Sequence, residues 1–152
     1  MILRLIVFLA INFGALAIGG LFTSQGVPSD WYVDMYKAPW TPPGWVFGAA
    51  WTTIMALFGV YMAYLWPANE NKKLLIGLYV IQLILNIGWN PTFFYYHSVL
   101  GGLLLISGLT MLIGFMLFFY FPQLRLKSIL IVPYLIWLLI ATSLNGFIWF
   151  NN

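Results

Sequence analysis

The sequence has no cysteine, one histidine and very few charged residues. Its 152 residues include six Lys or Arg and three Asp or Glu, so charged side chains make up 6% of the chain, whereas a soluble domain carries about 25%. Without cysteine there is no disulfide framework, no thiolate nucleophile and no sulfur metal site. His97 alone cannot assemble a metal cluster. So few charges cannot cover a surface that faces water on every side, which argues against a soluble globule.

Apolar and aromatic residues dominate what is present. The chain is 63% hydrophobic and 20% aromatic, with eight Trp. The hydrophobic content indicates a lipid bilayer as the surrounding medium. The aromatic content exceeds what crossing lipid requires, because Leu, Ile and Val do that equally well. A formal net charge of only +3, with no cluster of Lys and Arg, gives no support for nucleic-acid binding.

Five apolar stretches are long enough to cross a bilayer, which takes roughly 20 residues in a helix. They lack the strict two-residue alternation of a membrane β-barrel. The sequence therefore predicts an all-α membrane protein: a single domain over residues 1–152, folded as a bundle of five transmembrane helices with a long first loop over residues 24–43. The predicted spans are approximately 3–23, 44–65, 74–95, 99–120 and 129–150.

The first span also resembles a signal peptide, because Arg4 precedes an apolar run. Asn12, the Gly19-Gly20 pair and the lack of a clean cleavage site favour its retention. In a five-span arrangement only Lys37 lies on the side of the first loop. The positive-inside rule then places the amino terminus on the cytoplasmic or matrix-like side and the carboxyl terminus opposite. The basic residues expected on the amino-terminal side are Arg4, Lys72, Lys73, Arg125 and Lys127.

Small residues recur at four-residue spacing on two spans. Gly44, Gly48, Thr52 and Ala56 would allow another helix to approach the second span closely, and Ala15 with Gly19 would do so on the first. The pattern serves internal helix packing or a homodimer interface equally well.

The third span carries an amide-rich face. Steps of three and four residues place Gln82, Asn86, Trp89 or Asn90, and Phe93 on one side of the helix. Amides in hydrocarbon need partners, so this face points into the bundle. Pro91 removes a backbone donor and predicts a kink that opens space. Hydrogen bonding between helices and the lining of a ligand pocket both remain open as roles.

The fifth span repeats this arrangement with Tyr134, Trp137, Ala141 and Asn145. A large ring, a small residue one turn later and then an amide describe a wall with a notch, although Ala141 could equally admit a neighbouring helix. Trp66 and Trp149 lie at span ends and are typical of anchors at the membrane interface. His97, at the short turn between the third and fourth spans, is expected to be solvated.

Three segments in order resemble the TspO/MBR family of translocator proteins, also called tryptophan-rich sensory proteins or peripheral benzodiazepine receptors. The loop segment WYVDMYKAPWTPPGWVFGAAW (residues 31–51) is similar to the family's aromatic signature. YVIQLILNIGWNPTFF (residues 79–94) is similar to Y-x-x-Q-L-x-L-N-x-x-W-x-x-x-F-F. PYLIWLLIATSLNGFIWFN (residues 133–151) is similar to P-Y-x-x-W-x-x-x-A-x-x-L-N. Together these segments cover much of the chain.

The resemblance implies a five-helix bundle whose pocket, closed by the first loop, binds porphyrins, sterols in animal members and benzodiazepine-type drugs. It implies protoporphyrin IX or haem as a ligand, no required cofactor, no metal site, and a homodimer. Some bacterial relatives degrade porphyrin in the light, for which Trp51 and Trp137 would be the catalytic residues. Combined with the helix-face patterns, it predicts these ligand-binding residues: Trp31, Trp40, Phe47, Trp51, Gln82, Asn86, Trp89, Phe93, Trp137, Ala141 and Asn145.

Two departures from the family pattern bear on ligands. Met55 stands where many relatives carry a Tyr, which removes a hydroxyl contact. The sterol-recognition pattern of animal members needs a Tyr and then a basic residue after the motif leucine, but Gly146 and Phe150 occupy that stretch. The sequence therefore argues against sterol recognition at that site.

The sequence is consistent with three functions. The first is a membrane receptor or carrier that binds a flat tetrapyrrole, with a sensory or transport role. The second is an enzyme that consumes porphyrin with light and oxygen, through redox chemistry at indoles, because the spans offer no acid–base dyad, no activated nucleophile and no metal cluster. The third is a structural membrane subunit whose partner is another protein.

Overall fold

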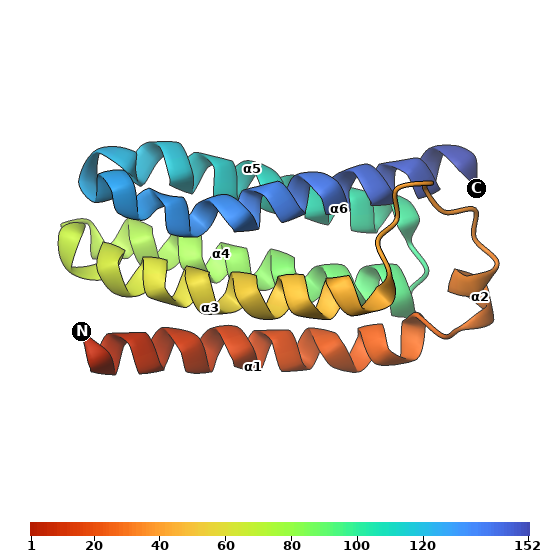
Figure 1. Ribbon diagram of the computed structural model, residues 1–152, viewed down its shortest axis with the longest axis horizontal. Coiled ribbons are helices and arrows are strands. Elements are labelled where there is room, and N and C mark those ends of the chain that lie inside the picture. Colours follow the sequence, from red (N-terminus) through yellow and green to blue (C-terminus); the bar gives the residue numbers. More distant parts are fainter.

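A computed structural model describes residues 1–152 and is entirely helical (Figure 1). The long helices run side by side along the long axis of the molecule, and the two termini lie at opposite ends. The elements in chain order are α1 (Ile2–Gly26), α2 (Asp30–Val33), α3 (Gly44–Ala68), α4 (Lys72–Asn90), the π-helix η1 (Pro91–Tyr95), α5 (Val99–Leu124), the 3-10 helix η2 (Arg125–Ile131) and α6 (Val132–Asn151).

Four helical segments are long and apolar enough to cross a membrane: Ile2–Gly26, Gly44–Ala68, Lys72–Tyr95 and Val99–Asn151. The all-helical class predicted from the sequence is confirmed, and the chain is an integral, multi-pass membrane protein. The count differs from the predicted five because η2 joins α5 to α6 without a break, so the last segment is 53 residues long and contains two predicted spans.

The helix geometry changes at Pro91, where the sequence predicted a kink. The α-helix α4 ends at Asn90, and the next turn is a π-helix in which the Tyr96 N–H donates to the Pro91 carbonyl at 2.9 Å. A wider turn of this kind is a recognised cause of helix bending. His97 then adopts a positive φ of 52°, and the Ser98 side chain caps α5 by accepting from the Gly101 N–H. The chain thereby reverses within three residues.

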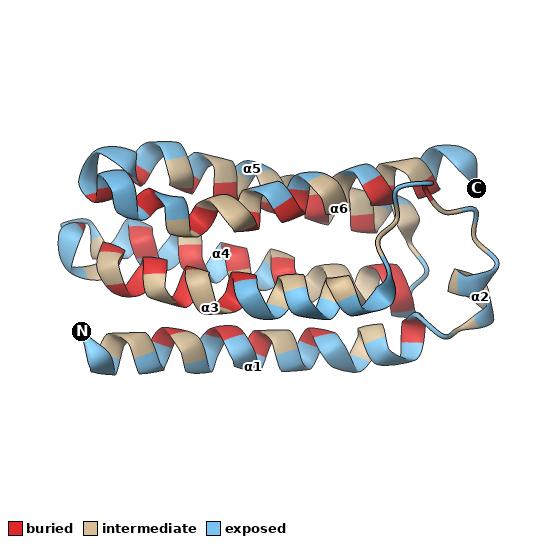
Figure 2. Cartoon of the chain, in the orientation of Figure 1, coloured by how far each residue is buried: buried red, intermediate tan, exposed pale blue.

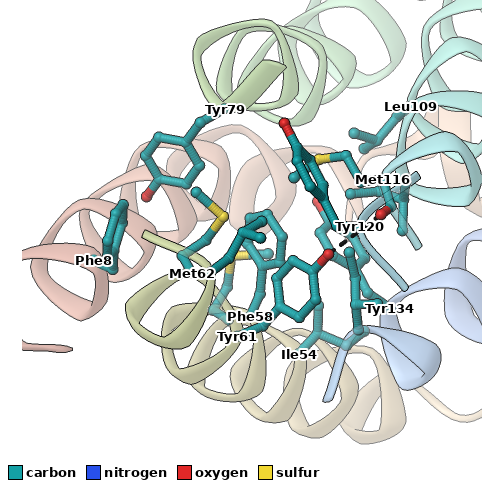
Figure 3. Close-up of a cluster of buried hydrophobic side chains, with 14 of the residues drawn as sticks. Phe8, Ile54, Phe58, Tyr61, Met62, Tyr79, Leu109, Met116, Tyr120 and Tyr134 are labelled. Carbon is teal, nitrogen blue, oxygen red and sulfur yellow. Dashed lines mark hydrogen bonds between the residues drawn. The ribbon is translucent and has the colours of Figure 1, made fainter. Parts of the chain in front are cut away.

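The main core occupies one half of the bundle. In α3 every buried residue lies between Ile54 and Leu65, and no residue before Ile54 is buried (Figure 2). Phe58 packs edge-on against Tyr134 with ring centroids 5.3 Å apart, and Tyr61 donates a hydrogen bond to the Met116 carbonyl (Figure 3). The core therefore lies toward the carboxyl-terminal half of α3 and leaves the other half of that helix less covered.

Close helix approach occurs at only some of the predicted small residues. A Cβ added at Gly19 would lie 2.6 Å from the Asn90 amide nitrogen, and at Gly59, which the spacing did not single out, one would lie 2.7 Å from a Leu9 methyl group. At Gly44 and Gly48 a Cβ would meet nothing within 4 Å. Internal packing therefore explains Gly19 and does not explain Gly44 or Gly48, while the homodimer interface stays a prediction.

The basic residues gather at one end of the bundle. Arg4 lies near the start of α1, Lys72 and Lys73 begin α4, and Arg125 and Lys127 lie in η2, all at the end of the molecule that carries the amino terminus. Lys37 lies at the opposite end, in the segment between α2 and α3.

Candidate ligand-binding cavity

A cavity of about 660 Å³ lies in the half of the bundle that the core leaves uncovered. Its walls come from α1, α3, α4, η1, α5 and α6, and residues of the segment 27–42 complete the lining. This volume falls in the range of about 300–1,000 Å³ that is typical of small-molecule sites.

Most of the predicted ligand-binding residues line this cavity, although they come from four separate elements. The helix periods explain the convergence, because Phe47 and Trp51 lie one turn apart on α3, and Trp137, Ala141 and Asn145 lie on successive turns of α6. The predicted residues in the lining are Phe47, Trp51, Asn86, Trp89, Phe93, Trp137, Ala141 and Asn145.

Aromatic rings in the cavity lining pack in pairs. Phe47 meets Trp137 edge-on with centroids 5.3 Å apart, which joins α3 to α6. Trp89 stacks on Phe93 with centroids 5.4 Å apart and ring planes 11° apart. These contacts hold the rings in fixed orientations, so the cavity presents flat apolar surfaces to a ligand.

Several polar atoms in this lining are buried without a hydrogen-bond partner. They are the indole nitrogens of Trp89 and Trp137 and the side-chain oxygen of Asn145. Buried polar atoms are normally paired, so unpaired ones call for an explanation. These three atoms are enclosed within the walls and are not exposed to the cavity; a Cβ added at Gly102 of α5 would lie 3.1 Å from the Asn145 side-chain oxygen.

Asn86 combines the two roles that the sequence left open. Its amide nitrogen donates to the Tyr134 hydroxyl at 2.7 Å, and its side chain also lines the cavity. Gln82, one turn earlier on α4, donates to the same hydroxyl at 2.8 Å, is fully buried and does not line the cavity. Gln82 therefore joins α4 to α6 behind the cavity wall.

Trp31 and Trp40 also lie outside the lining, where they attach the segment 27–43 to the bundle. Trp31 stacks on His97 with centroids 4.2 Å apart. The Trp40 indole N–H donates to the Ser143 hydroxyl at 3.1 Å, and Trp40 is 54% exposed. His97 is exposed, as the sequence predicted, but it carries this stacking contact.

Lys37 is the only charged residue in the lining. Its ammonium donates to the Val33 carbonyl at 3.0 Å and to the Met35 carbonyl at 3.4 Å, and lies 4.6 Å from the centre of the Tyr32 ring. Burial raises the pKa of the Tyr32 hydroxyl above its usual value. The segment over the cavity therefore contributes one cation and one neutral phenol.

The wall supplied by α1 was not predicted from the sequence. Thr23 donates to the Asn90 side-chain oxygen at 2.7 Å, and Asn90 in turn donates to the Asn86 carbonyl. The four-residue spacing of Ala15 and Gly19 was the packing signal in this helix; both residues line the cavity, and Gly19 is where the Asn90 side chain approaches. No periodic polar face marks α1, because its contribution is mostly small residues and backbone.

The cavity lining offers mostly apolar and aromatic groups, with a few amides and hydroxyls and one ammonium. No group of three or more His, Cys, Asp or Glu side chains that could hold a metal ion occurs in the structure. Aromatic faces, amides and one ammonium recognise a flat, largely apolar molecule with a few acceptor atoms. Fold and cavity together define a multi-pass helical membrane protein with an internal cavity lined by aromatic residues.

The chain belongs to the TspO/MBR family, whose sequence profile matches residues 6–150. It is 32% identical to protein CrtK of Rhodobacter capsulatus over 94% of this chain and 91% of that protein. It is 34% identical to the human translocator protein over 80% of this chain and 75% of that protein. It is 32% identical to the tryptophan-rich sensory protein of Cereibacter sphaeroides over 78% and 74% of the two chains. This family membership supports a membrane receptor or sensory role.

Proposed function

We propose that this protein is a receptor or carrier that binds planar tetrapyrroles, protoporphyrin IX or haem, and related flat hydrophobic molecules such as benzodiazepine-type drugs. The observation that carries the proposal is the cavity of about 660 Å³, whose lining includes the rings of Phe47, Trp51, Trp89, Phe93 and Trp137. Large rings held in place bury apolar area and stack on a flat ligand at little entropic cost.

The polar groups of the cavity match the acceptors of such a ligand. Porphyrin carboxylates accept hydrogen bonds, and the Lys37 ammonium, the one charged group of the lining, donates them. The Lys37 ammonium has three donors, of which two reach backbone carbonyls. Its remaining donor and its charge are available to a carboxylate at the end of the cavity covered by the segment 27–43.

The proposal includes five membrane crossings, with α5 and α6 as separate spans that η2 connects. Arg125 has a positive φ of 48°, which turns the chain at the end of α5, and α6 returns alongside that helix (Figure 1). The end that carries Arg4, Lys72 and Arg125 would face the cytoplasm or a matrix-like compartment, and the covered end of the cavity the opposite side.

Titration of the purified protein with protoporphyrin IX, followed by tryptophan emission, tests this proposal. We expect saturable quenching and an affinity about tenfold lower in Trp137→Ala, because an aromatic pair contributes about 0.5–1.5 kcal/mol beyond the apolar area it buries. Trp149→Ala is the matched control, since Trp149 is 43% exposed at the end of α6 and outside the cavity.

A second variant covers the case in which Trp137→Ala fails to fold. Ala141→Phe adds a ring inside the cavity and keeps the surrounding aromatic walls. It should abolish porphyrin binding while the circular dichroism stays helical. Absence of saturable quenching in the wild type, or unchanged affinity in a folded Ala141→Phe protein, would refute the proposed site.

Light- and oxygen-dependent porphyrin degradation is the alternative function. It is favoured by two oxidisable indoles, Trp51 and Trp137, that both line the cavity and would serve as its catalytic residues. Illumination of the complex with and without oxygen separates the two functions. A protein-dependent product that is lost in Trp51→Phe supports an enzyme, whereas loss of porphyrin at the rate of the free dye supports binding alone.

A further inference from the structure

The exposed residues of the cavity lining all lie along one edge. The lining residues of α4, η1, α5 and α6, and those at 32–42, are buried or half-buried. The exposed ones come from the end of α1 and the following turn, and from the start of α3: Gly20, Ser24, Val27, Pro28, Gly44 and Gly48. The cavity therefore opens between α1 and α3.

The two helices are in contact in one half and leave space in the other. Toward the amino-terminal end the Asn12 amide donates to the Met55 carbonyl at 3.0 Å, and Leu9 packs against Gly59. Toward the other end a Cβ at Gly20 or at Gly48 would meet nothing within 4 Å. Because glycine has no side chain, Gly20 on α1 and Gly48 on α3 leave the space between the two helices open.

The rim of this opening is apolar. Leu21, next to Gly20 on α1, is 65% exposed, and Trp45, next to Gly44 on α3, is 74% exposed. Neither residues 5–29 nor residues 38–69 contain a charged side chain. Gly20 lies six residues before the end of α1, which is about 9 Å along the helix axis. Both observations place the opening against hydrocarbon rather than water.

The covered end of the cavity is held by contacts that lie on another side of the bundle. The Tyr36 N–H donates to the Asn152 side-chain oxygen at 2.9 Å, and the Asn152 amide donates back to the Tyr36 carbonyl at 3.1 Å. Trp40 bonds Ser143 of α6 in the same region. Passage under this segment would break these contacts, whereas passage between α1 and α3 breaks none.

We propose that ligands reach the cavity sideways from the bilayer, through the opening between α1 and α3 that Gly20 and Gly48 keep free. This inference rests on the proposed ligand site and adds the route and the ligand class: a flat hydrophobic molecule that dissolves first in the lipid. The rate of loading then depends on the mole fraction of ligand in the membrane rather than on its aqueous concentration.

The first test measures porphyrin association by stopped-flow tryptophan quenching in proteoliposomes. We expect Gly20→Leu combined with Gly48→Leu to slow association and dissociation together by about tenfold or more, because the two side chains fill the gap. Gly14→Leu combined with Gly77→Leu is the matched control, since both positions are equally open and neither lines the cavity. Unchanged rates in the first pair would overturn the proposal.

The second test weakens the attachments of the segment 27–43. Ser143→Ala combined with Asn152→Ala removes hydrogen bonds to Trp40 and Tyr36. The association rate should stay within about twofold of wild type if ligands pass between the helices, because those bonds are not on the path. A clear increase in that rate would show passage under the segment instead, against the proposal.

A third test uses the absence of cysteine in the natural chain. A spin label attached to Gly48→Cys in detergent, before reconstitution, should collide with lipid-soluble oxygen more often than with a water-soluble nickel chelate, and bound protoporphyrin IX should reduce the collisions with oxygen; the reverse preference would overturn the proposal. Efficient formation of a disulfide-linked dimer would instead make Gly44 and Gly48 part of a homodimer interface and overturn the open route. If the wild-type protein shows no saturable porphyrin quenching, the proposed function itself fails. If the wild type binds porphyrin and Gly20→Leu combined with Gly48→Leu leaves the rates unchanged, only the proposed route fails.

Discussion

Replacing Tyr134 by Phe removes one oxygen atom at the centre of the bundle and leaves the ring in place. The Tyr134 hydroxyl accepts from Gln82 at 2.8 Å and from Asn86 at 2.7 Å, and the residue is 1% exposed. The ring keeps its edge-on contacts with Phe58 and Trp51 in the variant. The change therefore isolates a polar junction between α4 and α6.

The expected cost follows from two donors that lose their partner. Leaving a buried donor unpaired costs about 1–3 kcal/mol in water-soluble proteins. Interhelical hydrogen bonds in bilayers average about 0.6 kcal/mol, because the unfolded state in the membrane also finds partners. Two bonds then give a loss of about 1–3 kcal/mol in the free energy of unfolding. Release of Asn86 should also lower porphyrin affinity, since Asn86 lines the cavity.

Denaturation in mixed micelles, followed by circular dichroism and tryptophan emission, measures this loss. Tyr95→Phe is the control, because Tyr95 is 68% exposed, and its stability should stay within about 0.5 kcal/mol of wild type. A double-mutant cycle with Gln82→Leu should show coupling, because Tyr134→Phe should lower the free energy of unfolding by a smaller amount when one of the two donors is already absent. Equal stability of Tyr134→Phe and wild type, or strict additivity in the cycle, would refute the claim that the Tyr134 hydroxyl stabilises the contact between α4 and α6.

Three further predictions use the same assays. Gly26→Ala should lower the free energy of unfolding by about 1–3 kcal/mol, because the added Cβ would enter the Phe94 ring. Gly14→Ala, where the added Cβ meets nothing, should raise it by up to about 1 kcal/mol, and equal effects of the two variants would contradict this packing. Asn145→Leu should leave the free energy of unfolding unchanged or higher, because the amide oxygen of Asn145 has no partner, and should lower the affinity for protoporphyrin IX about threefold to tenfold. A loss of stability with normal affinity would show that Asn145 serves packing instead. His97→Ala should speed amide hydrogen exchange in Asp30–Val33 by about threefold or more, since the Trp31 stack is lost, and unchanged exchange would argue against that attachment.

The features that depend on local chemistry could be predicted from the sequence. A scarcity of charge and long apolar runs indicate a helical membrane protein, whatever the contacts between helices. Helical periodicity likewise placed Trp137, Ala141 and Asn145 on one face of a single helix, and the structure has them along one wall. The break at Pro91 follows from the missing backbone donor of that residue.

The features that depend on which helix meets which face required the tertiary structure. Trp31 and Trp40 belong to the same aromatic segment as Trp51, yet they attach the loop and do not line the cavity. Gln82 and Asn86 share a face of α4, and only the position of Tyr134 separates a buried connector from a lining residue.

The sequence by itself determined the medium, the helical class and the composition of each helix face, because these depend on residue type and on spacing within one helix. The tertiary structure decided where small residues pack and where they leave an opening. Gly19 and Gly48 look alike in sequence, but Asn90 approaches one and no atom approaches the other. That difference arises from contacts between helices far apart in the chain, which the spacing of residues within a helix does not encode.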